Sequence, residues 1–204
     1  MLEIITSQLS FCVSLLLFAM GAVGSLIFRK NNTVANWLGS FFAIIGASWG
    51  LIFSTSMIIA GKGMVFNFGL LNLPLLEFSF HIDMLSAFFI FIICLIALFC
   101  SIYGIGYIKH FYTKYSIGAL GFFYNLFIIG MLLVVTANNG IFFLIAWELM
   151  SVASYFLVIY DRNDQVNVKA GFLYLVMTHV GTAFIISSFI LLYRFTGSFD
   201  FEAI

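Results

Sequence analysis

The stretch Gly-Ile-Phe-Phe-Leu-Ile-Ala-Trp-Glu-Leu-Met-Ser-Val-Ala-Ser-Tyr-Phe-Leu-Val-Ile-Tyr occupies residues 140–160 and contains one charged residue, Glu148. A run of about 20 mostly apolar residues is long enough to cross the hydrocarbon core of a bilayer as a helix. A carboxyl group near the middle of such a helix is costly, and such residues usually face a partner or a water-filled path. The stretch therefore predicts a membrane-spanning helix that handles ions through Glu148.

The composition of the whole chain also indicates a membrane protein. Of its 204 residues, 64% are hydrophobic and 8% are charged, whereas soluble domains carry about 25% charged residues. Lys plus Arg and Asp plus Glu number eight each, so no basic surface points to a nucleic acid as partner. The composition predicts an integral membrane protein surrounded by the lipid bilayer.

Continuous apolar stretches of spanning length predict an all-α fold, a polytopic membrane helix bundle of about six transmembrane helices. They cover Ile4–Phe28, Trp37–Ala60, Met84–Ile108, Gly118–Thr136, Gly140–Tyr160 and Ala170–Tyr193. Strands are not expected, because these runs do not alternate in ten-residue segments as outer-membrane barrels do. The connection from Gly61 to Asp83, which contains the only proline, is expected to be the longest loop.

Basic residues predict the orientation of the spans. The first, third and fifth connections hold six of them: Arg29, Lys30, Lys109, Lys114, Arg162 and Lys169. The opposite side holds Lys62 and Arg194. Basic residues accumulate on the cytoplasmic side, so both termini are predicted to face outward in a bacterial-type inner (plasma) membrane. No basic residue precedes the first apolar run, which favours a retained span over a cleaved signal peptide.

The carboxyl group of Glu148 is predicted to meet an imidazole on the next span. Glu148 lies eight residues from Gly140, where this span is predicted to start at the outer face of the membrane. It is therefore ~12 Å from the outer face at ~1.5 Å per residue. His179 lies nine residues from Ala170 on the returning helix, which leaves it ~16 Å from the same face of a ~30 Å core. If the two spans pack as antiparallel neighbours, as their short connection indicates, both groups lie near the middle of the membrane.

Hydroxyl side chains share the faces of these two spans. Ser151 and Tyr155 follow Glu148 at i+3 and i+7, and Tyr174, Thr178 and Thr182 repeat at i+4 beside His179. Carboxyl, imidazole and hydroxyl groups donate and accept protons or hold the waters that do. The predicted proton-transfer residues are Glu148, His179, Lys169, Ser151, Tyr155, Thr178 and Thr182.

Each of these residues also has a simpler interpretation. A protonated, hydrogen-bonded Glu148 would only hold helices together, and His179 could be a packing histidine. Stripes of Ser and Thr are more often helix–helix contacts than proton paths. Lys169 is most simply an anchor whose ammonium group reaches the interface, although a role in proton uptake is open.

No residue pattern indicates a cofactor, a metal or a catalytic residue. A b-type haem in a bundle needs two facing axial histidines, but His81 and His110 lie near the ends of spans and only His179 lies deep. No phosphate-binding loop or nucleotide fingerprint is present. The three cysteines lie inside apolar runs without CxxC spacing: Cys12, Cys94 and Cys100. The sequence predicts no electron-transfer centre of its own.

Several motifs resemble the antiporter-like membrane subunits of respiratory complex I. Phe80-His81-Ile82-Asp83-Met84-Leu85-Ser86-Ala87-Phe88-Phe89 resembles the segment that opens the third span in that family. Asn138-Asn139 through Trp147-Glu148 to Ser154-Tyr155, then Lys169-Ala170 and Thr178-His179-Val180-Gly181-Thr182, are similar to the same family. The resemblance covers about residues 75–204. It is strongest to the membrane subunit of formate hydrogenlyase and hydrogenase-4 complexes, and extends to the large subunits of multisubunit sodium/proton antiporters.

The resemblance implies that Glu148 is the family's fifth-helix glutamate, which partners a lysine on a seventh helix in a proton half-channel. The chain stops before that helix, so a fragment or a truncated product is expected, and these residues alone are not expected to complete transport. His179 stands where many complex I members have Arg or Lys, and Thr182 where some have an acid. Both differences favour the hydrogenase branch.

Three regions are therefore predicted: an N-terminal two-helix segment (1–74), the N-terminal region of an antiporter-like subunit (75–137) and the start of its proton-translocating domain (138–204). The expected function is proton translocation through Glu148, in a complex with other membrane subunits and a peripheral redox arm. The alternatives are a subunit of a multisubunit sodium/proton antiporter, which would carry sodium as well, and a non-conducting structural anchor.

Overall fold

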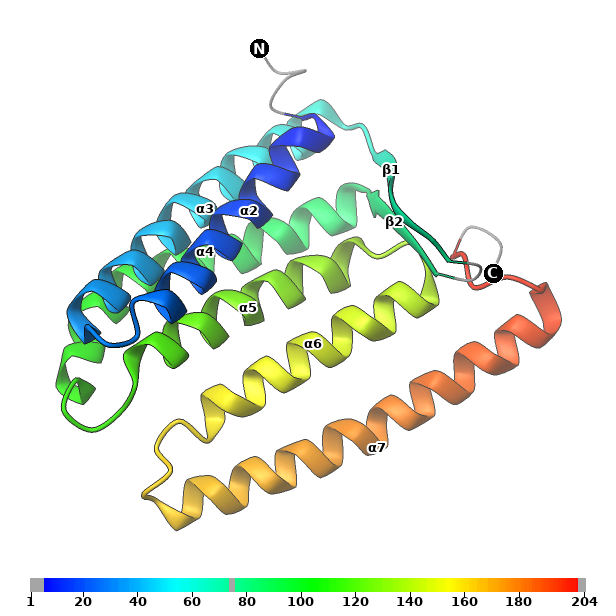
Figure 1. The fold of residues 1–204 in the computed structure, drawn as a ribbon. Coiled ribbons are helices and arrows are strands. Elements are labelled where there is room, and N and C mark those ends of the chain that lie inside the picture. Colours follow the sequence, from blue (N-terminus) through cyan, green and yellow to red (C-terminus); the bar gives the residue numbers. More distant parts are fainter. Residues whose placement is uncertain (1–5, 74–75, 202–204) are drawn as a thin grey trace.

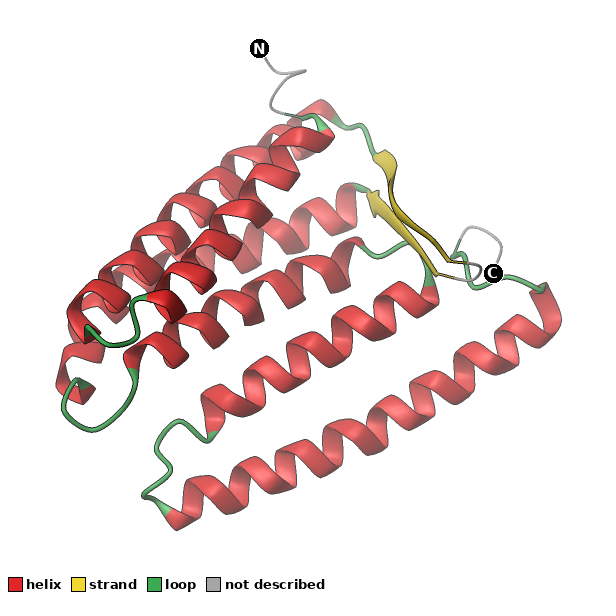
Figure 2. Ribbon diagram, in the orientation of Figure 1, coloured by secondary structure: helices red, strands yellow, loops and turns green. Residues whose placement is uncertain are grey.

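A computed structural model describes residues 6–73 and 76–201 as long helices with one β-hairpin at an end of the bundle (Figures 1 and 2). The elements in chain order are α2 (Gln8–Ile27), α3 (Asn32–Ala60), β1 (Met64–Leu73), β2 (Leu76–Ile82), α4 (Met84–Tyr107), the 3-10 helix η1 (Ile108–Phe111), α5 (Ile117–Thr136), α6 (Gly140–Val158) and α7 (Gln165–Thr196).

In the described part of the chain, six helices are long and apolar enough to cross a membrane. This finding confirms the all-α class and the six predicted spans. Two helices begin earlier than predicted by an equal margin: α3 begins at Asn32 and not at Trp37, and α7 begins at Gln165 and not at Ala170. For α7 a capping residue explains the earlier start. The helix begins there because the Asp164 carboxylate accepts a hydrogen bond from the Val166 amide at 2.9 Å, which satisfies a free amide of the first turn.

The connection between α3 and α4 is not a simple loop, and the expectation of no strands is wrong there. β1 and β2 form an antiparallel hairpin that pairs Met64 with Ile82 and Phe66 with Phe80. The run from Phe78 to Ile82 alternates apolar and polar residues, which is the pattern of a half-buried strand. Phe80 and Ile82 are accordingly buried, while the alternation is too short to resemble a barrel strand.

The hairpin and the C-terminal segment hold the predicted turn between α5 and α6 from two sides. On one side, the Asn138 amide donates to the Ser79 carbonyl of β2 at 2.9 Å. On the other, the Gly140 amide donates to the Phe199 carbonyl at 2.8 Å, and the Phe201 amide donates to the Asn138 carbonyl at 3.1 Å. These bonds fix the position at which α6 begins.

The apolar core lies among α2, α3, α4, α5 and the hairpin. At the hairpin end, rings from three elements form an aromatic cluster, in which Phe11 of α2 lies 6.0 Å from Phe80 of β2 and Phe80 lies 4.9 Å from Phe142 of α6. Edge-to-face pairs at such distances add to the stability that burial provides. The cluster therefore attaches the start of α6 to the core.

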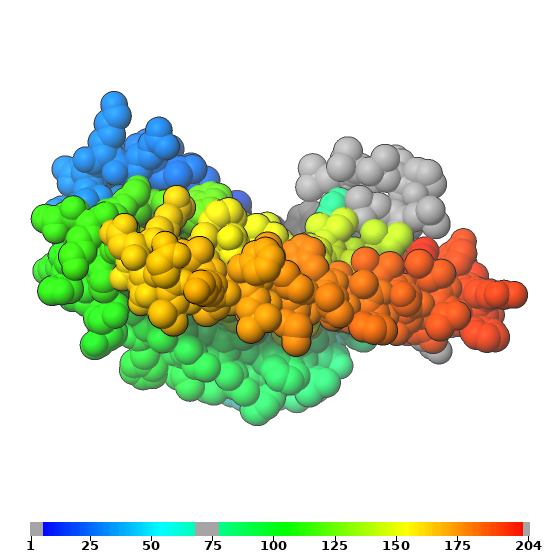
Figure 3. All heavy atoms as spheres, turned by 90° about the horizontal axis from the view of Figure 1, so that it is seen from below, coloured from blue at the N-terminus to red at the C-terminus, as the bar shows by residue number. Residues whose placement is uncertain are grey.

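The outermost helices are α6 and α7, which lie in order beside the four-helix core (Figure 1). Gly171 and Thr182 are the buried residues of α7 among those described. Figure 3 shows α7 running across one face of the molecule, with no other described segment over it. The most C-terminal span is thus held almost entirely through α6.

Asp83 forms the N-cap of α4, at the point where the hairpin ends. Its carboxylate accepts a hydrogen bond from the Ser86 amide at 2.7 Å. This bond lowers the pKa of Asp83 below its ordinary value of 3.8, and His81 lowers it further. The carboxylate therefore stabilises α4 in its ionised form.

Asp83→Ala should destabilise the folded protein by about 1 kcal/mol, the usual cost of losing an N-cap. Since the pKa is lowered on folding, the contribution is present above pH 3.8 and is lost as the pH falls through the folded-state value. Unfolding in detergent at neutral and at acidic pH measures the difference. A difference that grows on acidification would contradict this assignment, and Asp83→Asn should keep most of the cap.

Candidate functional site

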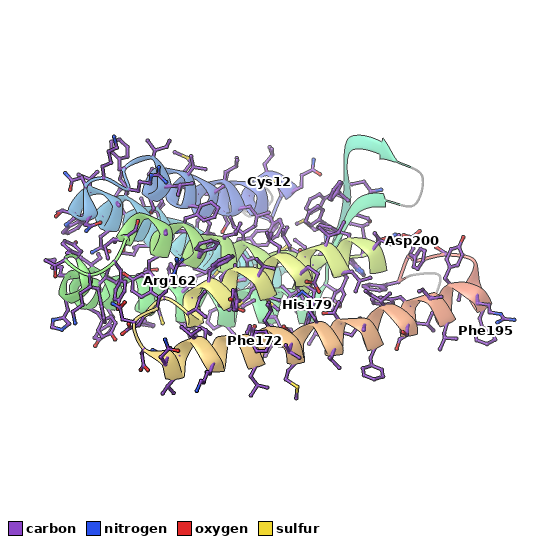
Figure 4. The ribbon with its side chains drawn as sticks, turned by 60° about the horizontal axis from the view of Figure 1, so that its bottom comes forward. Cys12, Arg162, Phe172, His179, Phe195 and Asp200 are labelled. Carbon is purple, nitrogen blue, oxygen red and sulfur yellow. The ribbon has the colours of Figure 1, made fainter. Side chains whose placement is uncertain are left out.

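The site lies between α6 and α7, and it starts from the way α6 is capped. The Asn139 side chain accepts hydrogen bonds from the amides of Ile141 at 2.9 Å and Phe142 at 3.4 Å. The same side chain donates to the Asp200 carboxylate at 2.8 Å. One asparagine thus begins α6 and ties it to the segment after α7, so the two helices lie antiparallel beside one another (Figure 4).

Glu148 and His179 meet across these two helices, as the depth argument predicted. The His179 Nε2 atom lies 3.6 Å from Glu148 Oε2, and their side chains are 51% and 35% exposed, respectively. Figure 4 shows His179 on the side of α7 that faces α6. It is the one ion pair found among the described residues. A carboxyl group and an imidazole, each near the middle of a spanning helix, therefore lie within ion-pairing distance of one another.

The hydrogen bond made by Nδ1 of His179 determines whether Nε2, the ring nitrogen that faces Glu148, can accept a proton. His179 Nδ1 lies 2.8 Å from the Leu175 carbonyl oxygen. Because a carbonyl oxygen can only accept, Nδ1 must carry the hydrogen. In the neutral ring Nε2 is then the acceptor, and this is the atom that faces Glu148. The pair can hold one proton either on the carboxyl group or on Nε2.

Three of the predicted hydroxyl residues, Ser151, Thr178 and Thr182, do not form a side-chain path between the two helices. Ser151 donates to the Trp147 carbonyl at 2.8 Å, and Thr182 donates to the Thr178 carbonyl at 3.0 Å. Thr178 likewise bonds carbonyl groups of its own helix. These contacts within a helix agree with the simpler interpretation of hydroxyl stripes.

Tyr155 and Lys169 lie near the connection between α6 and α7, at the end of the two helices away from Asn139. Tyr155 lies against Gly171 of α7, where a side chain larger than hydrogen would meet Ile159 and the Tyr155 ring. Lys169 is exposed in the second turn of α7, as an interfacial anchor would be. The small Gly171 thus sets the close approach of α7 to α6.

The structure adds a second polar contact between the helices that the predicted set of residues did not contain. The Ser154 hydroxyl of α6 and the Tyr174 hydroxyl of α7 are 2.5 Å apart. Ser154 lies six residues beyond Glu148, and Tyr174 lies five residues before His179, so both contacts follow one seam. This nearly equal spacing on antiparallel helices is the signal that could have found the second pair.

No group of three or more His, Cys, Asp or Glu side chains that could hold a metal ion occurs in residues 6–73 and 76–201. The three cysteines are free thiols, with Cys94 buried and Cys100 exposed. The side chains along the seam are carboxyl, imidazole and hydroxyl groups, which are able to donate and accept protons.

Two sequence models of protein families match the chain. The one described as "NADH:quinone oxidoreductase/Mrp antiporter, TM" matches residues 137–204, which include Glu148, His179 and the whole seam. The one described as "NADH-Ubiquinone oxidoreductase (complex I), chain 5 N-terminus" matches residues 72–116. The chain belongs to the family of antiporter-like membrane subunits.

Relatives of this antiporter-like chain occur in several complexes. It is 33% identical over 193 residues to hydrogenase-4 component B of Escherichia coli, an alignment that covers 93% of the chain and 28% of that relative. It is 32% identical over 129 residues to NADH-quinone oxidoreductase subunit L of Buchnera aphidicola, covering 63% and 20% respectively. The antiporter-like chain thus spans less than a third of the length of these relatives.

Two solved structures share the fold of the antiporter-like chain. A chain of the membrane-bound sulfane sulfur reductase, an archaeal respiratory membrane complex, superposes with a TM-score of 0.74 at 16% identity and covers 95% of this chain. A chain of the Mrp complex from Dietzia sp. gives a TM-score of 0.69 at 20% identity over 94% of this chain. The matches cover 39% and 20% of those chains, and at such identities they show the fold alone.

Proposed function

We propose that this chain is a proton-translocating membrane subunit of a respiratory-type oxidoreductase complex, of the hydrogenase-4, formate hydrogenlyase or NADH-quinone oxidoreductase kind. The observation that carries the proposal is the pairing of Glu148 Oε2 with the acceptor nitrogen of His179 at 3.6 Å. Other membrane subunits and a peripheral redox arm are the partners of such a subunit. Its place is the inner (plasma) membrane, with the chain's termini outward.

In this mechanism the pair holds a proton that moves between two atoms. When Glu148 is protonated, Nε2 of His179 accepts the proton and the two groups become a carboxylate and an imidazolium. An oppositely charged neighbour stabilises both ionised groups, whereas desolvation favours their neutral forms. A change in the surroundings of the pair therefore decides whether Glu148 or His179 holds the proton. A second such change releases the proton.

Protons reach the pair along the seam and the waters beside it. The Ser154–Tyr174 contact lies about two helical turns from Glu148, on the side of Lys169 and the start of α7. Ser151, Tyr155, Thr178 and Thr182 line the helices around it and offer hydroxyls to water. Electrons pass through other subunits.

The proposal is tested on the complete complex that contains this chain, reconstituted in vesicles with a pH-sensitive dye inside. Electron transfer should drive proton movement across the membrane that persists when sodium is removed and disappears with a protonophore. Movement that requires sodium would instead favour a sodium/proton antiporter subunit. Electron transfer without any ion movement would identify a non-conducting anchor and would contradict the proposal.

Tyr174→Phe should slow proton movement about fivefold, because it removes one hydrogen bond of about 1 kcal/mol that connects the seam. Tyr193→Phe is the matched control, since Tyr193 lies on the same helix but stacks on Phe199 at 4.5 Å with its ring alone. The initial rate of dye response at equal electron flux measures both. Equal rates for native protein and Tyr174→Phe would remove Tyr174 from the path.

A further inference from the structure

A cavity of about 240 Å³ opens between the start of α5 and the end of α6. It lies at the end of the bundle opposite the hairpin, near Arg162 in Figure 4. The residues around it are of two kinds, with charged and polar side chains at the helix ends and apolar ones further into the spans. They are Lys114, Tyr115, Ser116, Ala119, Leu120, Phe123, Phe156, Tyr160 and Arg162.

The mouth of the cavity is cationic. Lys114 lies just before α5 and Arg162 lies just after α6, and both are exposed. Neither forms an ion pair with any described residue, since the one pair found there joins Glu148 and His179. The start of α5 adds the positive end of a helix dipole, and the Ser116 side chain makes no capping hydrogen bond there.

The two acidic residues next to this mouth are already engaged by other groups. Asp161 accepts a hydrogen bond from the Tyr115 hydroxyl, which in turn accepts one from the Asn163 side chain at 3.2 Å. The bond to Asp161 raises the pKa of Tyr115, so the hydroxyl keeps its proton at neutral pH. Asp164 also acts electrostatically on Tyr115, but its carboxylate accepts the hydrogen bond from the Val166 amide at the start of α7. Asp161 is turned to Tyr115, so neither acid is paired with Lys114 or Arg162.

The floor of the cavity is apolar and lies within the membrane. Phe123 of α5 and Phe156 of α6 stack with ring centroids 4.3 Å apart and planes 19° apart. Phe123 follows the first residue of α5 by six residues, which places it ~9 Å into the span at ~1.5 Å per residue. A ligand for this cavity must therefore be anionic at one end and apolar at the other.

A second cavity among the described residues lacks this combination. It measures about 310 Å³ between α3, α4 and α5, and its walls include Asn36, Ser101 and Tyr124 but no charged side chain. It therefore offers no counter-charge to an anion, whereas the cavity between α5 and α6 offers two.

We propose that the cavity between α5 and α6 binds an anionic phospholipid, with its phosphate between Lys114 and Arg162 and the first part of an acyl chain against Phe123 and Phe156. Basic pockets between membrane helices on the cytoplasmic side suit anionic headgroups, and this is the side that the basic residues predict to be cytoplasmic. The volume is below that of common drug-sized sites, so only the part of the lipid nearest its headgroup enters. The lipid would hold α6 against α5 at the end opposite the hairpin.

The test uses native mass spectrometry of the purified protein in detergent, titrated separately with phosphatidylglycerol and phosphatidylcholine. The native protein should bind the anionic lipid more tightly. Lys114→Gln with Arg162→Gln should bind it about 30-fold more weakly, because each basic residue near the headgroup contributes to binding, while phosphatidylcholine binding should not change. Lys30→Gln with Lys109→Gln is the matched control, since it removes the same charge from the same predicted side and neither residue lines the cavity.

Four results would overturn the proposal: equal binding of the two lipids by the native protein, an equal loss in the control variant, no loss in the cavity variant, or displacement of the lipid by an equal concentration of inorganic phosphate. The last result would identify a site for a free anion. Ala119→Phe, which fills the cavity without changing charge, provides a second test if the double variant does not fold. It should also weaken phosphatidylglycerol binding, and unchanged binding would contradict the apolar half of the site.

Discussion

Glu148→Gln should abolish proton movement while the complex still assembles and transfers electrons. Glutamine has nearly the shape of glutamic acid but cannot titrate, so it can neither give a proton to Nε2 of His179 nor receive one from it. The His179 ring remains held by its Nδ1–H bond to the Leu175 carbonyl, so the geometry of the seam should persist. Dye response in vesicles, at an electron flux matched to the native complex, measures the loss.

Glu148→Asp is the matched control for this prediction. It keeps a titratable carboxyl group on α6 but moves it away from His179, which lies 3.6 Å from the native oxygen. Proton movement should therefore be slowed but present. Full activity of Glu148→Gln would show that Glu148 serves only to hold the helices together, and it would leave the chain as an anchor. Because the lipid site shares no residue with the seam, that outcome would not affect the lipid test.

Gly130→Ala should destabilise the protein by about 1–3 kcal/mol, the range for overfilling a packed interior. A Cβ atom at Gly130 of α5 would lie 2.9 Å from the Cα and Cβ atoms of Met150 on α6. These are atoms of the backbone or next to it and cannot turn away, so α6 must move away from α5. Met150 is two residues from Glu148, and the movement should also disturb the Glu148–His179 pair.

Gly106→Ala in α4 is the control for this substitution, since nothing lies within 4 Å of the added atom. Alanine is a better helix former than glycine by up to about 1 kcal/mol, so this variant should be as stable as the native protein or slightly more stable. Thermal unfolding of all three proteins in one detergent measures the order. Equal stability of Gly130→Ala and Gly106→Ala would show that α5 and α6 are not in close contact at this point.

The sequence predicted the spans and the central pair because both depend on distance along the chain. A run of about 20 apolar residues must cross the bilayer as a helix, since its backbone groups find no other partners there. A fixed rise per residue then places Glu148 and His179 at similar depth, and the short connection makes their helices neighbours. The family could also be predicted from the sequence, because the Trp-Glu run and the α7 motif are short local stretches of the chain. The orientation of the termini and the division at residues 74 and 137 stay predictions.

Which side chains touch was decided only by the tertiary structure. Ser151 and Thr178 share faces with the pair but bond their own helices, whereas Ser154 and Tyr174 join α6 to α7. The spacing of residues gives the depth and the face of a side chain, but the rotation of each helix about its axis depends on packing. That rotation is set by close contacts such as Gly130 with Met150 and Gly171 with Ile159, and by the hydrogen bonds that the hairpin and the C-terminal segment make to the turn before α6.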